Sequence, residues 1–436
     1  MYESPFRFWL GSKLCYCVYN PSDLKIVMNN PNALQKDEVY KFMEGVVGTG
    51  LFTASVPKWK RNRRIINPTF NQIILDNYVK IFSEQSTILL DILKIENAKG
   101  EFDVCNYISR CTLDIFCETA VGTTVNAQTR NSEYVKWANR AMKITYNRIF
   151  KVWYHSDFIF NLTSQANELK EVTENMHNFT RMVVKKAREN YQKKCKEQDL
   201  LTPIFDEEPQ KRKSFLQLLI ELSENGAMFT NEDICDEVDT FMIAGSDTTA
   251  LSISFALIML AMYQEIQEKV YQEVINVLGP DRQPNHTDLK KFDYMERVIY
   301  ESLRIFPPGP MVIRAVTKDI HLEKCTLPAG TSVAMLIFGL HWDSAIYPNP
   351  FSFDPNRFSP EEIAKRHTYS WLPFSGGVRN CIGLKFALLV MKTVVANTVR
   401  KYKLSTPYKR VEDIRLKADV TLKPIDGFKI SIELRD

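Results

Sequence analysis

No uncharged stretch of this 436-residue sequence is long enough to cross a membrane. One apolar stretch runs from Thr248 to Gln264 and has 17 residues, whereas a membrane-spanning helix needs about 20 mostly apolar residues. Arg7 interrupts the first apolar stretch near the N-terminus, so we expect no signal peptide in this sequence. We therefore expect the segment 248–264 to be the buried core helix of a globular protein.

The sequence also lacks a strong net charge and paired cysteines. Its 56 Lys and Arg residues nearly balance 52 Asp and Glu residues, and no basic stripe is interleaved with aromatic residues. This composition predicts no nucleic-acid partner. None of the nine cysteines has the Cys-x-x-Cys spacing of a zinc site, and their odd number and irregular spacing predict reduced thiols in a protein that faces the cytosol.

Internal repeats and linkers between domains are absent as well, so we predict a single domain that spans residues 1–436. Apolar residues recur at helical spacing over much of the chain. This spacing predicts helices at about 70–97, 103–121, 132–148, 163–196, 230–264, 264–278, 288–305 and 382–402. Short β-rich segments are expected before residue 30, at 311–317, 319–327 and 331–337, and at the C-terminus, and an exposed polar loop at 196–214. The predicted fold class is mainly α with a minor β component.

One cysteine lies in a glycine-rich loop that leads into an apolar helix. The loop is FSGGVRNCIG, residues 374–383, and Cys381 lies near its end. We expect Gly376 and Gly377 to permit unusual backbone angles and the close approach of a flat ligand. The helix N-terminus is expected to lower the pKa of the Cys381 thiol, and Arg379 adds a charge that can pair with a carboxylate. The alternative is an ordinary buried cysteine in a turn, but a chance match to the full spacing has a probability on the order of one in ten thousand.

A second segment, AGSDTT at 244–249, interrupts an apolar helix with residues that are poor choices for a helix interior. We expect Gly245 to leave space for a flat ligand or O2, and a threonine hydroxyl to disturb the helix by bonding backwards. Asp247 and Thr248 then offer a proton route. The alternative is a helix that starts at Ser246 or Asp247, but the apolar pattern begins earlier in the sequence.

Together the two segments resemble the signatures of the cytochrome P-450 superfamily, F-x-x-G-x-R-x-C-x-G and A/G-G-x-D/E-T-T. The resemblance implies the cytochrome P-450 fold, with the thiolate of Cys381 as the ligand of a haem iron. Phe374, Arg379 and Gly383 would belong to the haem-binding loop around it. Thr248 and Asp247, as the catalytic pair, would handle protons for the bound dioxygen.

Basic residues elsewhere fit the same resemblance. The segment WKRNR at 59–63 resembles the family's C helix, in which Trp59 and Arg63 reach a haem propionate. A basic surface turn is the alternative. Arg314, which follows the proline run at 307–310, fits the family's third propionate-binding arginine.

Glu301 and Arg304 lie three residues apart on a predicted helix and resemble the family's E-x-x-R motif. With Arg357 downstream, they are expected to form a buried structural triad that has no catalytic role. A solvated surface ion pair, which stabilises a protein by well under about 1 kcal/mol, is the alternative.

Within the superfamily the sequence resembles the family 4 clan and its insect members, in DEVDTFM at 236–242 and in residues 59–70. Ala244 stands where many fatty-acid hydroxylases of this clan carry a Glu that bonds to the haem, so we expect a non-covalent haem b and a divergent enzyme of detoxification or odorant clearance. The clan's N-terminal membrane anchor and most of its hinge do not appear, and the sequence is expected to be an incomplete or trimmed product. Glycines at 45, 48 and 50 do not indicate a dinucleotide site, because no strand–turn–helix context surrounds them.

The resemblance implies a monooxygenase that inserts one oxygen atom of O2 into a small apolar substrate. The chain has no flavin or nicotinamide motif, so electrons are expected from NADPH–cytochrome P-450 reductase, with cytochrome b5 as a further donor, docking near Lys385 and Arg379. The expected location is the cytosolic face of the endoplasmic reticulum membrane.

Two alternatives remain at this stage. One is a haem-thiolate isomerase or dehydratase that needs no O2, and the other is a non-catalytic haem or lipid binder from a truncated gene. We expect the substrate pocket to be formed by residues 40–56, 150–180 and 309–313 and by the helix near Phe241.

Overall fold

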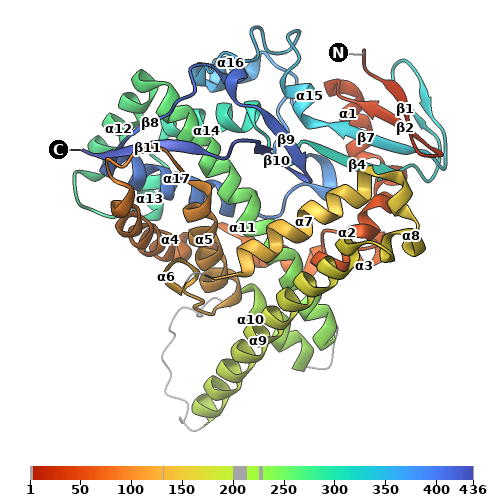
Figure 1. Ribbon diagram of the computed structural model, residues 1–436, viewed down its shortest axis with the longest axis horizontal. Helices are drawn as coiled ribbons and strands as arrows, with labels where there is room; N and C mark the ends of the chain where they lie inside the picture. Colours follow the sequence, from red (N-terminus) through yellow and green to blue (C-terminus); the bar gives the residue numbers. More distant parts are fainter. Residues whose placement is uncertain (1–2, 131, 200–213, 225–228, 436) are drawn as a thin grey trace.

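A computed structural model describes residues 3–130, 132–199, 214–224 and 229–435. Within these residues a large helical body lies beside a smaller sheet that contains the N-terminal strands (Figure 1). Most of the predicted loop 196–214 falls outside the described residues, and its first four residues still belong to a helix. The predicted helices are otherwise confirmed to within a few residues.

The helices of the body follow the predicted periodicity, and several end at Gly or begin at Pro. They are α1 (Pro21–Asn29), α2 (Lys41–Val47), α3 (Val56–Ile66), α4 (Gln72–Leu93), α5 (Cys105–Phe116), α6 (Ala127–Arg130), α7 (Tyr134–Phe150), α8 (Asp157–Asn161), α9 (Ser164–Asp199), α10 (Phe215–Glu224), α11 (Asn231–Met262), α12 (Gln264–Leu278), α13 (His286–Leu289), α14 (Asp293–Ile305), α15 (Ile337–His341), α16 (Pro360–Ala364) and α17 (Leu384–Lys401). A π-helical turn, Cys117–Val121, continues α5.

The main sheet joins segments that are far apart in the sequence. Its strand order is β1-β2-β7-β4, where β1 is Phe6–Leu10, β2 is Lys13–Val18, β7 is Ser332–Leu336 and β4 is Met311–Ala315. Only β2 and β7 pair in parallel, with Cys15 opposite Ser332. The smaller sheets contain β3 (Phe102–Asp103), β11 (Lys429–Leu434) and β8 (Tyr402–Ser405), then β9 (Leu416–Asp419) with β10 (Thr421–Pro424), and β5 (Ile320–His321) with β6 (Thr326–Leu327).

Helix α11 runs through the middle of the molecule and organises the rest (Figure 1). Its first turn is held by a capping box, in which Thr230 Oγ1 accepts a hydrogen bond from the N–H of Asp233 at 3.1 Å. The helix therefore does not begin at Ser246 or Asp247. It is the single described helix that is long and apolar enough to span a membrane, and 78% of its most apolar window is buried inside the protein. The predicted core helix is confirmed.

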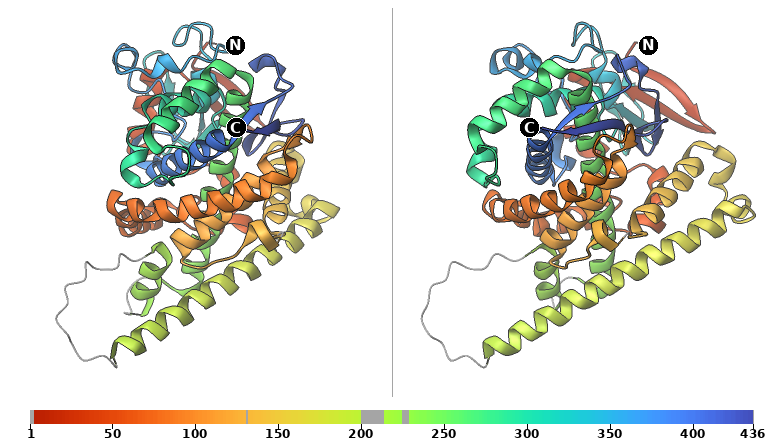
Figure 2. Two further views of the ribbon diagram at one scale, coloured as in Figure 1. Left: turned by 90° about the vertical axis from the view of Figure 1, so that its left-hand side faces the viewer. Right: turned by 60° about the vertical axis from the view of Figure 1, so that its left-hand side comes forward.

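Helix α9 crosses one end of the body and packs on α7 and α11 (Figure 2). Its buried side includes Met176 and Val183, whereas much of its other side is exposed, as expected of an amphipathic surface helix. Among the described residues all eight cysteines are free thiols, which agrees with the predicted reduced state. The C-terminal strands return to the core, where Phe428 packs against Phe255 of α11.

Candidate functional site

The sequence-predicted site residues meet around one cavity beside the middle of α11. Side chains from α3, α11, β4 and the loop before α17 line it. The predicted residues that line it are Trp59, Arg63, Ala244, Thr248, Arg314, Phe374, Arg379, Cys381 and Gly383. Of the predicted catalytic and cofactor-binding residues, Asp247 is the one that does not line it.

Cys381 lies on the floor of the cavity, just before α17. Its backbone N–H donates to the carbonyl oxygen of Phe374 at 2.9 Å, which closes the loop. The side chain is exposed to the cavity, but the cavity lies inside the protein, and the resulting desolvation raises the pKa of the Cys381 thiol. A hydrogen bond from the N–H of Gly383 and the charge of Arg63 oppose that rise. The expected lowering of the pKa is therefore wrong for the protein chain alone, because desolvation outweighs both effects.

The two loop glycines are needed for contact with α1 and not with a ligand. Gly377 has a φ of +66°, and a Cβ atom there would lie 2.2 Å from the carbonyl oxygen of Met28. A Cβ at Gly376 would lie 3.0 Å from the sulfur of Met28. Neither glycine lines the cavity. The predicted unusual backbone angle is confirmed at Gly377, whereas the predicted approach to a flat ligand is wrong, since these positions face the end of α1.

Two arginines enter the cavity with nitrogen atoms that lack a partner. These are Nη1 of Arg314 and both Nε and Nη1 of Arg379, all buried. Arg379 stacks on the ring of Trp59 at 4.5 Å, and its Nη2 donates to the carbonyl oxygen of Ala54 at 2.9 Å. Burial, together with the nearby charge of Arg314, lowers the pKa of Arg379 to about 9. Buried donors without partners are rare, so these arginines fit an anionic ligand such as a carboxylate.

Arg63 joins α3 to the cysteine loop. Its Nη1 and Nη2 donate to the backbone and side-chain oxygens of Asn380 at 2.8 and 2.9 Å. The nearby Trp59 is buried in the core. The segment 59–63 is therefore part of a cavity wall, and the alternative of a basic surface turn is wrong.

Lys36 is a further cation in the cavity, which the sequence analysis missed. Its Nζ lies 4.1 Å from the ring centroid of Tyr40 and 4.4 Å from that of Phe52, and its backbone forms a β-bridge with Arg314. Burial, reinforced by the charges of Arg314 and Arg379, holds the pKa of Lys36 well below its ordinary value. No local pattern in the sequence marks this lysine, because its surroundings come from distant segments.

On the opposite wall, α11 presents Phe241, the small residues Ala244 and Gly245, and four hydroxyl residues, Thr240, Thr248, Thr249 and Ser252. Thr248 Oγ1 donates to the carbonyl oxygen of Ala244 at 2.7 Å, which confirms the predicted backward hydrogen bond. A Cβ atom at Gly245 would lie 2.8 Å from the ring of Phe116, so the missing side chain at this position makes space primarily for that ring. Asp247 points to β10 instead, where Lys423 Nζ lies 3.5 Å from its carboxylate.

None of the described acidic residues lines the cavity, whereas the cations Lys36, Arg63, Arg314 and Arg379 do. Asp239, the other acid near Ala244, accepts hydrogen bonds from His177 and Thr180 on α9. A flat apolar group with two carboxylates and a metal that prefers thiolate fits this combination of walls, cations and cysteine. The residues present therefore fit a haem.

The predicted structural triad is confirmed. Arg304 donates to both carboxylate oxygens of Glu301 at 2.6 and 2.8 Å, and Arg357 lies 3.4 Å from the same group. Both Glu301 and Arg304 are completely buried, and neither lines the cavity. A surface ion pair is thus excluded.

The predicted substrate pocket is correct in part. Leu51, Phe52, Phe241, Gly309 and Val312 line the cavity, as expected. Residues 150–180, all within the described part of the chain, contribute nothing to its lining. Instead α5 and the segment after α3 supply aromatic side chains of the wall.

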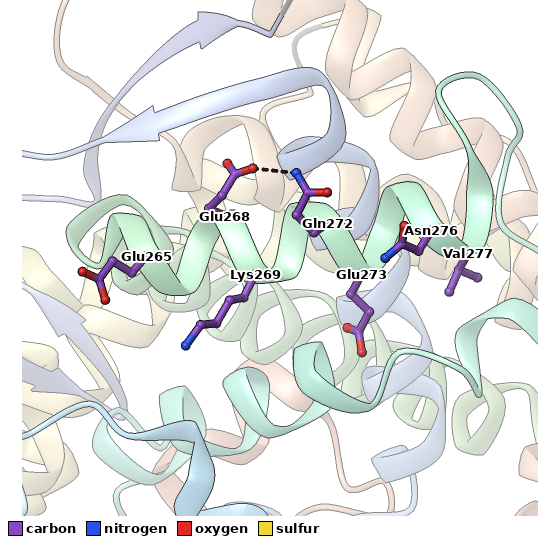
Figure 3. Close-up of a pocket in the computed structure, with 7 residues that line it drawn as sticks. All are labelled: Glu265, Glu268, Lys269, Gln272, Glu273, Asn276 and Val277. Atoms are coloured by element: carbon purple, nitrogen blue, oxygen red, sulfur yellow. Dashed lines mark hydrogen bonds between the residues drawn. The ribbon is translucent and has the colours of Figure 1, made fainter.

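Figure 3 shows another hollow, on the surface of α12. One helix supplies all the residues that line it. Glu273, its best-buried acid, already accepts hydrogen bonds from the N–H groups of Tyr294 and Met295 at the start of α14. This hollow follows the surface of a single helix and its half-buried acid is already hydrogen-bonded to α14, so the cavity at Cys381 remains the candidate site.

Comparisons with known proteins agree with this geometry. The family model described as cytochrome P-450 matches residues 1–432. The chain is 36% identical to cytochrome P-450 4c3 of Drosophila melanogaster, over 99% of this chain and 82% of that protein. It is 35% identical to human cytochrome P-450 4V2, again over 99% and 82%. A crystal structure of a cytochrome P-450 haem domain matches with a TM-score of 0.81 at 23% identity, covering 99% of this chain and 89% of the other, which supports the fold.

Proposed function

The chain belongs to the cytochrome P-450 family and is a haem-thiolate monooxygenase, and on this basis we propose that its substrate is a small apolar molecule and its electron donor an NADPH-dependent reductase. The observation that carries the proposal is the combination of Cys381, unpartnered cationic nitrogens and apolar walls around one cavity. When bound, the haem would supply the activation of O2. The residues of the chain hold the cofactor, exclude water and position a proton.

The cofactor of this proposal is a non-covalent haem b. Cys381 would be its metal ligand, with Phe374 and Gly383 in the loop around it. Arg314 and Arg379 are placed for the propionates, and Trp59 lines the same cavity beneath the Arg379 guanidinium. Ala244 has a methyl side chain and cannot form an ester. The cofactor is then retained by the iron–sulfur bond, charge-assisted hydrogen bonds and apolar packing.

Proton delivery in this proposal involves Thr248, which lines the cavity, and Asp247, which does not. The Thr248 hydroxyl is at the cavity wall and can hold a proton donor there. Asp247 lies behind the wall with Lys423 and Thr421 of β10. It would therefore exchange protons with the side of α11 that faces away from the cavity.

The cavity walls support a small apolar substrate. Phe52, Phe70, Phe116 and Phe241 surround the space above the cysteine, and Val312 closes one side. Sites for small molecules are mostly apolar with few placed polar groups. Similarity to the family 4 clan is consistent with a lipid-like, odorant or xenobiotic substrate.

Electrons are proposed to enter from the side of Cys381. Exposed basic residues lie there, Lys60 and Arg64 on α3 and Lys385 on the first turn of α17. They provide a surface for an acidic flavoprotein, NADPH–cytochrome P-450 reductase, or for cytochrome b5. Arg379, the other basic residue expected to dock the reductase, points into the cavity and is assigned to the haem.

The cytosolic face of the endoplasmic reticulum membrane is the proposed location. Trp9 of β1 and Trp153, Phe158 and Leu162 around α8 are each more than half exposed. Gly11, in the β1–β2 turn, lies against Val152, so these segments adjoin. Exposed apolar patches mark interaction sites, and this one is suited to a lipid surface. Binding to phosphatidylcholine vesicles, lost when Trp9 and Phe158 are both changed to Ser, would test it.

Turnover with O2 tests the function directly. The haem-loaded protein, reductase and NADPH are incubated with apolar compounds preselected by a shift of the ferric Soret band. Incorporation of one ¹⁸O atom from ¹⁸O2 into product supports the proposal. Conversion of substrate without oxygen incorporation would favour an isomerase or dehydratase, and ligand binding with no conversion would favour a non-catalytic binder.

A further inference from the structure

We propose that the polar run Asp236–Thr240 of α11 is a clamp that fixes residues 45–52 as a wall of the cavity, and that this wall selects substrates by size. The inference rests on the proposed function, since it concerns the substrate of the same site. It assigns a role to two features that the haem site leaves unexplained. These are the acidic run itself and the glycines at 48 and 50.

Three residues of the run bind the wall directly. Thr240 Oγ1 donates to the carbonyl oxygen of Val47 at 2.6 Å, and Glu237 accepts from the N–H of Leu51 at 2.9 Å. Thr49 Oγ1 donates to Asp236 at 2.5 Å. Residues 45–47 of the wall form the end of α2, and residues 48–52 have no regular structure, so the backbone groups of this stretch use these side chains as partners. Side chains of α11 thus supply the hydrogen-bond partners that residues 47–51 would otherwise need from a neighbouring strand.

Glycine permits the contact to be this close. A Cβ atom at Gly50 would lie 2.5 Å from Thr240 Oγ1 and 2.7 Å from the carbonyl oxygen of Asp236. At Gly48, where φ is +67°, it would lie 2.6 Å from the Asp236 carboxylate. Real Cβ atoms do not approach so closely, so any side chain at these positions forces the wall away from α11. By contrast, a Cβ at Gly45 has no atom within 4 Å.

Glu237 links the wall to helix α3. It is completely buried, and besides Leu51 it accepts a hydrogen bond from Asn62 Nδ2 of α3 at 2.6 Å. Helix α3 carries Trp59 and Arg63 of the cavity. One carboxylate therefore sets the position of the wall relative to the haem side of the site.

Asp239 extends the clamp to α9. The Nδ1 atom of His177 lies 2.8 Å from Asp239, and its Nε2 lies 2.9 Å from the carbonyl oxygen of Gly45. Both partners are acceptors, so both ring nitrogens carry protons when both hydrogen bonds form. The imidazolium links α9, α11 and the start of the wall.

Leu51 and Phe52 are the side chains that the clamp places in the cavity. They lie on the wall, whereas Cys381 is on the floor formed by another part of the chain. Moving the wall therefore changes the fit of a bulky ligand but leaves the access of a small ligand to the iron unchanged. A change in the affinity for a bulky ligand without a change in the affinity for a small one therefore distinguishes a positioning role of the wall from general damage to the fold.

The test compares Gly50→Ala with the matched control Gly45→Ala in the haem-loaded ferric protein. Imidazole and 4-phenylimidazole are titrated by the Soret shift. For Gly50→Ala we expect an imidazole dissociation constant within about twofold of the parent and a 4-phenylimidazole constant changed by about tenfold or more. Gly45→Ala should change neither. Equal effects on both probes, a smaller selective change, or the same selectivity in Gly45→Ala would overturn the clamp.

A second variant guards against misfolding of the first. Thr240→Val keeps the shape of the side chain and removes the hydrogen bond to Val47. It should change the ratio of the two constants in the same direction as Gly50→Ala, and an unchanged ratio would contradict the proposal. Failure of the parent protein to bind imidazole at its haem would refute the proposed function instead, so the two failures are distinguishable.

Discussion

The carboxylate of Asp247 lies 3.5 Å from the ammonium group of Lys423, outside the cavity that the next residue, Thr248, lines. Lys423 and Thr421 of β10 contact the Asp247 carboxylate and hold it on the side of α11 that faces away from the cavity. The hydroxyl of Thr248 is thus the group of the pair that contacts the cavity. The acid can influence the reaction only from behind the helix.

Thr248→Ala should leave haem binding intact and uncouple NADPH consumption from product formation. Without the Thr248 hydroxyl, the cavity wall would no longer position a proton at this point, and reduction of O2 to peroxide would compete with product formation. Product and peroxide formed per NADPH are the quantities to measure. Thr248→Ser keeps a hydroxyl and should retain much of the coupling. An unchanged product yield in Thr248→Ala would remove this residue from the mechanism.

Ala244→Glu should make a fraction of the haem resist extraction after turnover. The side chain at this position enters the cavity, and none of the described acidic residues lines it in the parent. Acid–organic extraction followed by chromatography under denaturing conditions should release all the haem from the parent protein. Haem that co-migrates with the denatured parent chain would show that another carboxylate forms the bond.

Arg304→Met should destabilise the protein by about 3–5 kcal/mol, because it leaves the buried carboxylate of Glu301 without its main partner. Urea unfolding followed by circular dichroism measures this loss. Lys80→Ala, which removes an exposed ion pair with Glu84, is the control and should cost less than about 0.5 kcal/mol. Equal stability of Arg304→Met and the parent would contradict the structural role of the triad.

The stability of the protein should fall as pH rises through the pKa of His177. The hydrogen bond to Asp239 raises the pKa of His177 above its ordinary value of 6.5, against burial and the nearby charge of Arg181. Its contribution is therefore fully present below about pH 6.5 and is lost as the pH passes the higher folded-state pKa. Urea midpoints measured from about pH 6 to about pH 9 should decline more in the parent than in His177→Gln. Parallel profiles would disprove this contribution.

Much of the site could be predicted from the sequence because its chemistry is concentrated in short motifs. Cys381, Arg379 and Thr248 lie in segments whose residue order reflects local geometry, and each lines the cavity. The core position of α11 followed from its apolar run. Local sequence carries such information since helix periodicity and loop spacing are local properties.

The parts that sequence analysis missed depend on contacts between distant segments. Lys36 enters the cavity because β4 pairs with its segment across nearly 280 residues. The direction of Asp247 is set by β10, and the need for glycine at 377 is set by Met28. Residues 150–180 were expected in the pocket, yet none of them lines it, and their apolar side chains either pack in the core away from it, as Met176 does, or lie on the surface, as Phe158 does. No local pattern encodes these relationships.

Cys381→Ser tests the central claim most directly. An alcohol is a far poorer donor to iron than a thiolate, so the reduced carbonyl complex should lose its thiolate-type spectrum. Arg379 and Arg314 remain in this variant, and any retained haem would be held without the sulfur ligand. The account predicts complete loss of that spectrum in Cys381→Ser. An unchanged spectrum would place the iron ligand elsewhere and contradict the account.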